Sequence, residues 1–168
     1  MLKRMWLASK LDVPFYEMVE ADSSYTREAF FVVLLVAVLS GIGAVATAGA
    51  SVADLFLSFL GAILGWVAWA GITLFIGLRL TRGAETQSDM GEMLRVLGYA
   101  QSPQVLLVFA FVPLLGKAIV AVAAIWSLIA GVVAIRQALD FGTGRAILTV
   151  ICGWLVVALL QSLLHLLV

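Results

Sequence analysis

The sequence of 168 residues is 64% hydrophobic and 12% charged, with a mean hydropathy of +1.15. So little polar material cannot cover a soluble globule, which excludes a soluble domain and predicts an integral membrane protein. Ten Lys and Arg balance ten Asp and Glu without any basic run, so nucleic acid is not an expected partner. The one cysteine, Cys152, has no second cysteine with which to form a disulfide.

Residues 1–28 are predicted to form short amphipathic helices that lie on the cytoplasmic surface of the membrane. Apolar residues alternate with three cations in residues 1–10. This mixture is typical of a segment whose apolar groups enter the headgroup region while its cations stay in water. A second short helix is expected to start at Asp12 to Pro14. The transmembrane domain then occupies residues 29–168.

Five segments of that domain are long and apolar enough to cross the roughly 30 Å of hydrocarbon in a bilayer. We predict spans near residues 30–49, 55–78, 97–115, 118–135 and 147–168. The predicted fold class is all-α, a polytopic bundle of five transmembrane helices preceded by short interfacial amphipathic helices. The third and fourth spans form a hairpin, because Pro113 removes a backbone donor and Gly116 tolerates a positive φ.

The positions of the cations predict the orientation of the spans. In a five-span arrangement all Lys and Arg residues fall on one side except Lys117. Because cytoplasmic loops carry the excess of Lys and Arg, the N-terminus is predicted to be cytoplasmic and the C-terminus to lie on the opposite side. Four or six spans would scatter the cations over both sides.

Three stripes of small residues are candidates for helix packing in the bundle interior, since close van der Waals contact holds helices together in lipid. They are Ser40, Ala44 and Ala48 in the first span, Gly61, Gly65 and Ala68 in the second, and Ala123, Ser127 and Gly131 in the fourth. Such spacing is frequent by chance in spans rich in Gly and Ala. The sequence leaves open whether these contacts are made within one chain or between two.

No Asp, Glu, Lys or Arg falls in the middle of a predicted span, although ionisable groups kept there usually mark ion paths, proton relays or catalysis. The motifs of metalloproteases and serine hydrolases are missing from the sequence. The single histidine, His165, has neither a companion metal ligand nor an obvious nucleophile. We therefore expect no enzymatic activity, no catalytic residue, no metal and no cofactor.

Residues 99–103 are the most distinctive polar segment of the spans. Pro103 has no backbone N–H, so the carbonyl of Tyr99, four residues earlier, lacks its usual donor. Gln101 or Ser102 is expected to supply one. The resulting kink is either a recognition site for a lipid, a ligand or a partner helix, or an ordinary proline kink at the cytoplasmic interface.

Four short motifs resemble the bacterial branch of the Yip membrane-domain family. They are residues 98–103, residues 113–116, residues 125–128 followed by Gly131, and the loop 142–146. The resemblance implies five spans, a cytoplasmic N-terminus and a non-enzymatic role in membrane organisation or protein association. Eukaryotic relatives interact with Rab-type GTPases. This sequence lacks their long cytoplasmic N-terminal region, so a small GTPase is not an expected partner.

The predicted function is that of a scaffold or adaptor in a bacterial cytoplasmic (inner) membrane. Its surroundings are the lipid bilayer, and its expected partner is a membrane protein or a second copy of the chain. The predicted recognition surface combines the N-terminal segment with residues 79–95 and 140–145. The alternative is a small channel or carrier for a neutral polar or lipid-like solute, which would use Gln101 and the face of the fourth span that carries Ser127.

Overall fold

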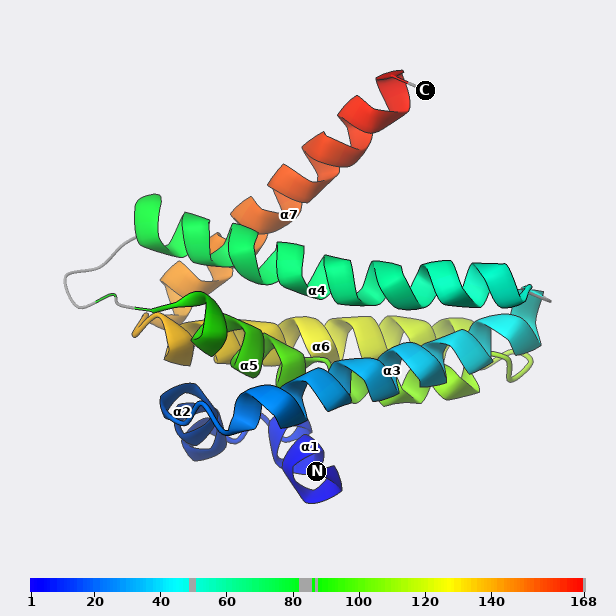
Figure 1. Ribbon diagram of the computed structural model, residues 1–168, viewed down its shortest axis with the longest axis horizontal. Helices are drawn as coiled ribbons and strands as arrows, with labels where there is room; N and C mark the ends of the chain where they lie inside the picture. Colours follow the sequence, from blue (N-terminus) through cyan, green and yellow to red (C-terminus); the bar gives the residue numbers. More distant parts are fainter. Residues whose placement is uncertain (49–50, 82–85, 87, 168) are drawn as a thin grey trace.

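The computed structural model describes the chain apart from residues 49–50, 82–85, 87 and 168, with all side chains except those of residues 48, 52, 158 and 160–167. Within the described residues the regular elements are helices, and the all-α fold class is confirmed. In chain order they are α1 (Leu2–Ser9), α2 (Val13–Ala21), α3 (Tyr25–Ala48), α4 (Val52–Arg79), α5 (Met90–Ala100), the 3-10 helix η1 (Ser102–Phe109), α6 (Gly116–Ala138) and α7 (Thr143–Leu167) (Figure 1).

The long helices α3, α4 and α6 run along the long axis of the molecule (Figure 1). α5 and η1 follow one another along the same axis and pack against both α3 and α6. α7 packs against α4 and α6 and then diverges from the bundle. α1 and α2 pack against α5 and α6, beside the start of α3.

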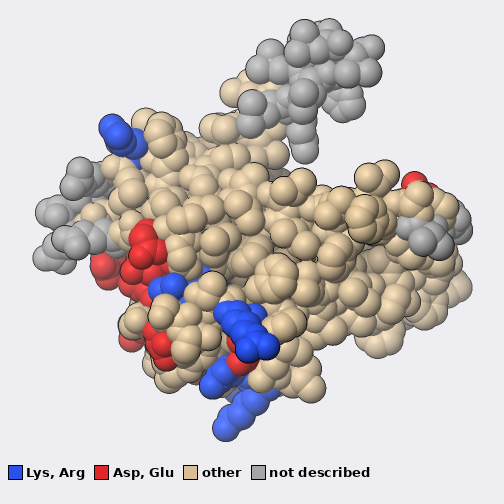
Figure 2. All heavy atoms as spheres, viewed as in Figure 1, with Lys and Arg blue, Asp and Glu red and all other residues tan. Residues whose placement is uncertain are grey.

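Charged side chains gather at one end of the bundle, which we call the charged end (Figure 2). It consists of α1, α2, the starts of α3 and α5, the end of α4 and the turn between α6 and α7. Between this end and the other, the surface exposes large apolar side chains such as Phe56, Leu64 and Phe75. Because a charge in lipid is costly, this segregation fits a bundle whose middle lies in hydrocarbon.

Within the described residues, three helices are long and apolar enough to cross a membrane. They are Tyr25–Thr47 in α3, Ala53–Arg79 in α4 and Gly116–Ala138 in α6. They coincide with the first, second and fourth predicted spans. α7 contains a shorter apolar stretch, Thr143–Val157, and most side chains beyond it lie outside the described part. The fifth span therefore stays a prediction.

The third predicted span, residues 97–115, is not one continuous α-helix, and its crossing of the membrane stays a prediction. α5 ends at Ala100, and the chain continues as η1 and then as turns up to Leu115. A 3-10 helix advances about 2.0 Å per residue, so the eight residues of η1 cover about 16 Å. Hydropathy predicted that this segment is apolar, but the hydrogen-bonding ladder is interrupted by Pro103.

η1 and α6 form the predicted hairpin, but the residue with a positive φ in its turn is not the one that we expected. Leu114, which is fully exposed, takes the positive φ of 66° that we expected at Gly116. Gly116 is needed for a different reason. A Cβ at this position would lie 2.0 Å from the carbonyl oxygen of Ala110, so only glycine allows the two backbone segments to approach.

α1 and α2 share a hydrophobic core with the bundle. Tyr16 and Val19 of α2 are fully buried in one cluster with Met93 and Tyr99 of α5. The ring of Phe15 meets the ring of Tyr99 edge-on, with centroids 5.1 Å apart. Large aromatic side chains bury much apolar area and pack well in this geometry. The two N-terminal helices are therefore part of the folded unit.

Candidate functional site

The kink between α5 and η1 positions the polar residues of the segment 99–103. The hydroxyl of Ser102 donates to the carbonyl oxygen of Tyr99 at 2.6 Å. This confirms that a side chain of the segment supplies the donor that Pro103 lacks. Ser102 and Tyr99 are both buried, whereas Gln101 reaches a cavity beside the kink.

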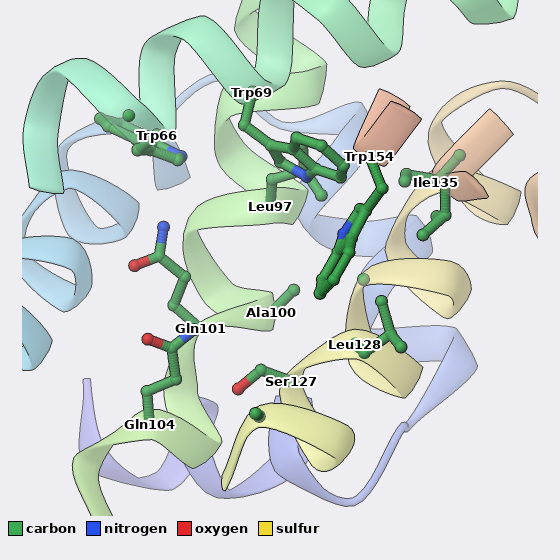
Figure 3. Close-up of a pocket in the computed structure, with 14 residues that line it drawn as sticks. Trp66, Trp69, Leu97, Ala100, Gln101, Gln104, Ser127, Leu128, Ile135 and Trp154 are labelled. Carbon is green, nitrogen blue, oxygen red and sulfur yellow. The ribbon is translucent and has the colours of Figure 1, made fainter. Parts of the chain in front are cut away.

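A cavity of about 340 Å³ lies between α4, the kink, α6 and α7 (Figure 3). Three polar side chains reach it: Gln101 and Gln104 from the kink and η1, and Ser127 from α6 opposite them. The rest of the lining is apolar or aromatic and includes Trp69 and Trp154. The fold thus brings together Gln101 and Ser127, the two residues that the predicted channel or carrier needs at one place.

The cavity is electrically neutral. None of the described residues that line it carries a formal charge. Within the described part of the chain, the Ser127 hydroxyl oxygen is buried and has no hydrogen-bond partner. Such orphaned groups are rare in proteins, because leaving one unpaired costs about 1–3 kcal/mol. The carboxamides of Gln101 and Gln104 can hydrogen-bond a neutral polar group, but the cavity has no countercharge for an ion.

At the charged end, Arg95 of α5 is buried, with only 6% of its surface exposed. Its Nε donates to the carbonyl of Val19 at 2.9 Å, and its Nη2 donates to the carbonyl of Glu20. Both carbonyls belong to the last turn of α2, where a cation is favoured by the helix dipole and the terminal carbonyls lack partners within the helix. Arg95 therefore fixes α2 to α5.

Several carboxylates lie near Arg95, where α2 packs against α5 and α6. Burial raises the pKa of Glu20 to about 7, with further contributions from the nearby carboxylates of Asp140, Glu92 and Glu17. Glu17 also accepts a hydrogen bond from Nε2 of Gln137 at 2.9 Å, which links α2 to the end of α6. The charge of Glu20, and with it the net charge of this helix contact, therefore changes near neutral pH.

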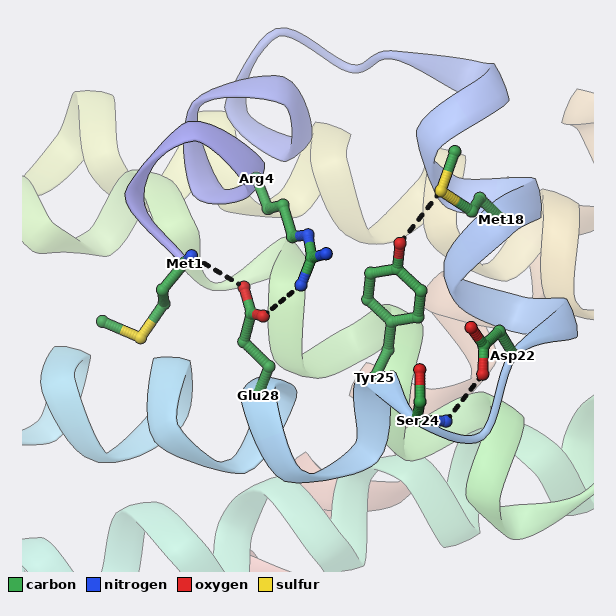
Figure 4. A network of polar contacts seen from close by, with 7 residues as sticks. All are labelled: Met1, Arg4, Met18, Asp22, Ser24, Tyr25 and Glu28. Atoms are coloured by element: carbon green, nitrogen blue, oxygen red, sulfur yellow. Dashed lines mark hydrogen bonds and ion pairs between the residues drawn. The ribbon is translucent and has the colours of Figure 1, made fainter.

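A second polar network ties α1 to α3 (Figure 4). The guanidinium of Arg4 donates to the carboxylate of Glu28 and lies over the ring of Tyr25, 4.6 Å from its centroid. The hydrogen bond to Glu28 raises the pKa of Arg4 above its ordinary value. The Tyr25 hydroxyl in turn donates to the sulfur of Met18 at 3.0 Å, which adds α2 to the network.

Residues 12–164 match the model of the Yip1 domain. The chain belongs to the Yip1 family. Its Yip1 domain begins at Asp12, which accepts a hydrogen bond from the backbone N–H of Phe15 and caps the start of α2. The match includes the Arg95 anchor and the cavity, and it leaves α1 outside. Comparison with curated proteins and with solved structures gives no match.

Membership of the Yip1 family confirms the resemblance that the sequence motifs indicated, although the bacterial branch stays a prediction. Together with the three long apolar helices, it identifies an integral membrane protein.

The predicted small-residue stripes of this Yip1 protein lie in different surroundings. Gly61, Gly65 and Ala68 are exposed, and a Cβ at either glycine would meet nothing within 4 Å. Within the described residues no side chain packs closely on these two glycines, and α4 buries another face, which carries Trp66 and Thr73. Contact through this stripe between two chains stays a prediction.

The other two stripes are only partly buried. In α6, Ala123 is buried, while Ser127 and Gly131 are half-buried and line the cavity. In α3, Ser40 is half-buried and Ala44 is exposed, and the side chain of Ala48 lies outside the described residues. Small residues in this Yip1 protein therefore help to keep a cavity open as well as to let helices approach.

Sequence reasoning missed three residues of the site. Gln104 carries the second carboxamide of the cavity, and Trp69 and Trp154 form its aromatic walls. Their meeting depends on how α4, η1 and α7 pack, and no local motif encodes that arrangement.

Proposed function

We propose that this Yip1 family protein is a non-enzymatic membrane scaffold or adaptor whose charged end is the recognition surface and faces the cytoplasm. The observation that carries this proposal is the anchored platform of α1 and α2, held to the bundle by the buried Arg95 and by the pair of Arg4 and Glu28. The exposed charged side chains of the platform and its neighbouring turns include Lys3, Arg4, Lys10, Glu17, Asp22, Arg27, Asp89, Asp140 and Arg145.

The surface of α1 supports a position at the membrane interface. Leu2 and Trp6 are 72% and 60% exposed, next to the exposed cations Lys3 and Lys10. Apolar side chains of this kind enter the headgroup region while neighbouring cations stay in water. The platform therefore meets both the bilayer and the aqueous phase, which suits an adaptor that binds another membrane protein or a second copy of the chain in a bacterial inner membrane.

The proposed topology has five crossings, with the C-terminus opposite the charged end. α5 and η1 together serve as the third crossing, since the extended rise of η1 lets a short segment reach the hairpin turn. The proposed role requires no catalytic residue, metal, cofactor, nucleic acid or small GTPase.

Photo-crosslinking from single positions tests the adaptor. A photoreactive residue replaces Ser23, which is exposed in the turn between α2 and α3, or Leu57, which is 64% exposed on the apolar side of α4. We expect one identified protein to be captured from position 23 and not from position 57. A photoreactive residue placed in that protein should in turn capture this chain. Arg95→Ala, which releases α2, should reduce this capture. Equal capture from both positions, or capture insensitive to Arg95→Ala, contradicts the proposal.

A second candidate function, a carrier for a neutral polar or lipid-like solute, is favoured by the cavity that joins Gln101 to Ser127. Reconstituted vesicles test it directly with glycerol as a neutral polar solute and a fluorescent monoacylglycerol as a lipid-like one. Flux that depends on the protein and falls in Gln101→Leu supports the carrier. Flux equal to that of empty vesicles contradicts it and leaves the adaptor untouched.

A further inference from the structure

The cavity is elongated along α6. Its α6 wall extends from Ala124 to Ile135, which at 1.5 Å per residue is a length of about 16 Å. With a volume of about 340 Å³ it lies at the small end of ligand-binding pockets, which hold roughly 300–1,000 Å³. A narrow cavity of this length and volume accommodates one hydrocarbon chain or one slender ring system.

The polar part of the cavity offers both donors and acceptors. Each carboxamide, of Gln101 and Gln104, has a carbonyl oxygen that accepts and an amide nitrogen that donates, and the Ser127 hydroxyl can do both. Figure 3 shows the Ser127 hydroxyl pointing toward the side of the cavity from which the two glutamines project. Within the described residues, the buried Ser127 oxygen has no partner in the protein. This oxygen is closed to solvent in the observed rotamer, so a bound hydroxyl group pairs with it once the Ser127 side chain rotates.

The remaining walls are apolar. Trp69 of α4 and Trp154 of α7 line the cavity, and Leu97 of α5 and Leu128 of α6 add aliphatic side chains to its lining (Figure 3). Aromatic and aliphatic walls bind a hydrocarbon, while the described residues provide no charge to pair with an ionised headgroup. The combination selects a neutral molecule that is polar at one end and apolar at the other.

Two glycines keep this volume open. A Cβ at Gly65 or at Gly131 would meet no atom within 4 Å, although both residues line the cavity. The space beside them is therefore not filled by packing of the described side chains. The Cβ of a larger side chain at either position would displace no neighbour at this edge of the cavity.

We propose that the cavity binds one neutral single-chain amphiphile, with hydroxyl groups of its headgroup on Gln101, Gln104 and Ser127 and its hydrocarbon along Trp69 and Trp154. The proposal names the ligand class for the cavity of the second candidate function and rests on that cavity. The proposal requires binding but no transport. Binding without flux therefore contradicts the carrier function and supports the binding site. Flux without saturable binding overturns the binding site.

Tryptophan fluorescence in phosphatidylcholine nanodiscs tests the site, with dibrominated monostearoylglycerol as a quenching probe at low mole fraction. We expect saturable quenching, weakened about tenfold in Ser127→Ala and in Gln101→Leu, since one lost hydrogen bond of about 1.4 kcal/mol corresponds to that factor. Dibromostearic acid, ionised at pH 9, has the same chain with a charged headgroup and should bind at least about tenfold more weakly. Equal binding of the two probes overturns the neutral headgroup.

The glycines supply a matched control on a single helix. Gly65→Leu should abolish saturable quenching, because its side chain fills the cavity. Gly61→Leu, one helical turn away at an equally open position outside the lining, should leave it unchanged. Gly131→Leu blocks the opposite wall and serves if Gly65→Leu fails to fold. Unchanged quenching in a folded Gly65→Leu or Gly131→Leu protein, or an equal loss in Gly61→Leu, overturns the proposal.

Discussion

At the residue scale, Arg95 combines a full charge with the burial of a core residue. Its acceptors are backbone carbonyls 75 and 76 residues away in the chain, so no residue type marks them in the sequence. The apolar neighbours Leu94 and Val96 indicate that this stretch is partly buried, but we grouped Arg95 with the loop cations. The guanidinium of Arg95 thereby supplies the hydrogen-bond donors that a glycine C-cap or water usually provides to the terminal carbonyls of a helix.

Replacing Arg95 by alanine should weaken the docking of α2. The carbonyls of Val19 and Glu20 lose charged donors, and we expect the free energy of unfolding to fall by about 2–3 kcal/mol. Hydrogen–deuterium exchange in detergent micelles measures this as faster exchange of the α2 amides. Arg27→Ala is the control, because Arg27 is exposed and lies over the ring of Phe31. Equal exchange in the two variants contradicts the role of Arg95 as an anchor.

Glu20 should make the stability of the protein depend on pH. Its pKa is raised from 4.5 to about 7, so the folded state binds a proton more tightly than the unfolded state. By linkage, the contribution is fully present below about pH 4.5 and is lost as pH rises through about 7. We expect the melting temperature to fall over this window and Glu20→Gln to remove that part of the slope. A wild-type slope that persists unchanged in Glu20→Gln contradicts the assignment.

At the scale of the elements, η1 shows where prediction from hydropathy stops. The apolar residues of segment 97–115 predicted its place in the membrane, and Pro103 predicted a kink with a substitute donor, which Ser102 provides. The 3-10 conformation that follows could not be predicted, because it depends on packing against α3 and α6 as well as on local propensity. Helices without such an interruption, α3, α4 and α6, follow the predicted spans closely.

The kink can be tested with a double-mutant cycle on Ser102 and Pro103. Ser102→Ala leaves the buried carbonyl of Tyr99 without its side-chain donor and should lower the free energy of unfolding by about 1–3 kcal/mol. Pro103→Ala restores a backbone N–H that can bond to the same carbonyl. We therefore expect Ser102→Ala to cost less in the Pro103→Ala background, measured by thermal unfolding in detergent. Additive effects of the two changes would show that the two donors do not compete.

At the scale of the whole molecule, charge and packing follow different rules. The segregation of charged residues to one end could be predicted, because the cost of a charge in lipid acts on every residue of a span independently. The packing of α1 and α2 onto the bundle and the cavity between α4, α6 and α7 could not. Both depend on contacts between residues far apart in the chain, such as Trp126, whose indole N–H donates to the carbonyl of Ser9 at 2.6 Å.

The proposed topology predicts which residues a membrane-impermeant thiol reagent labels. In a Cys152→Ser background, Lys117→Cys lies at the exposed start of α6, opposite the charged end, and should react in intact cells. Ser88→Cys, just before α5 at the charged end, should react only after the membrane is permeabilised. A C-terminal epitope tag should be accessible with Lys117→Cys if α7 completes a fifth crossing. Labelling of Ser88→Cys in intact cells would contradict the proposed orientation. A C-terminal tag that becomes accessible only after permeabilisation, as expected for Ser88→Cys, would contradict the fifth span.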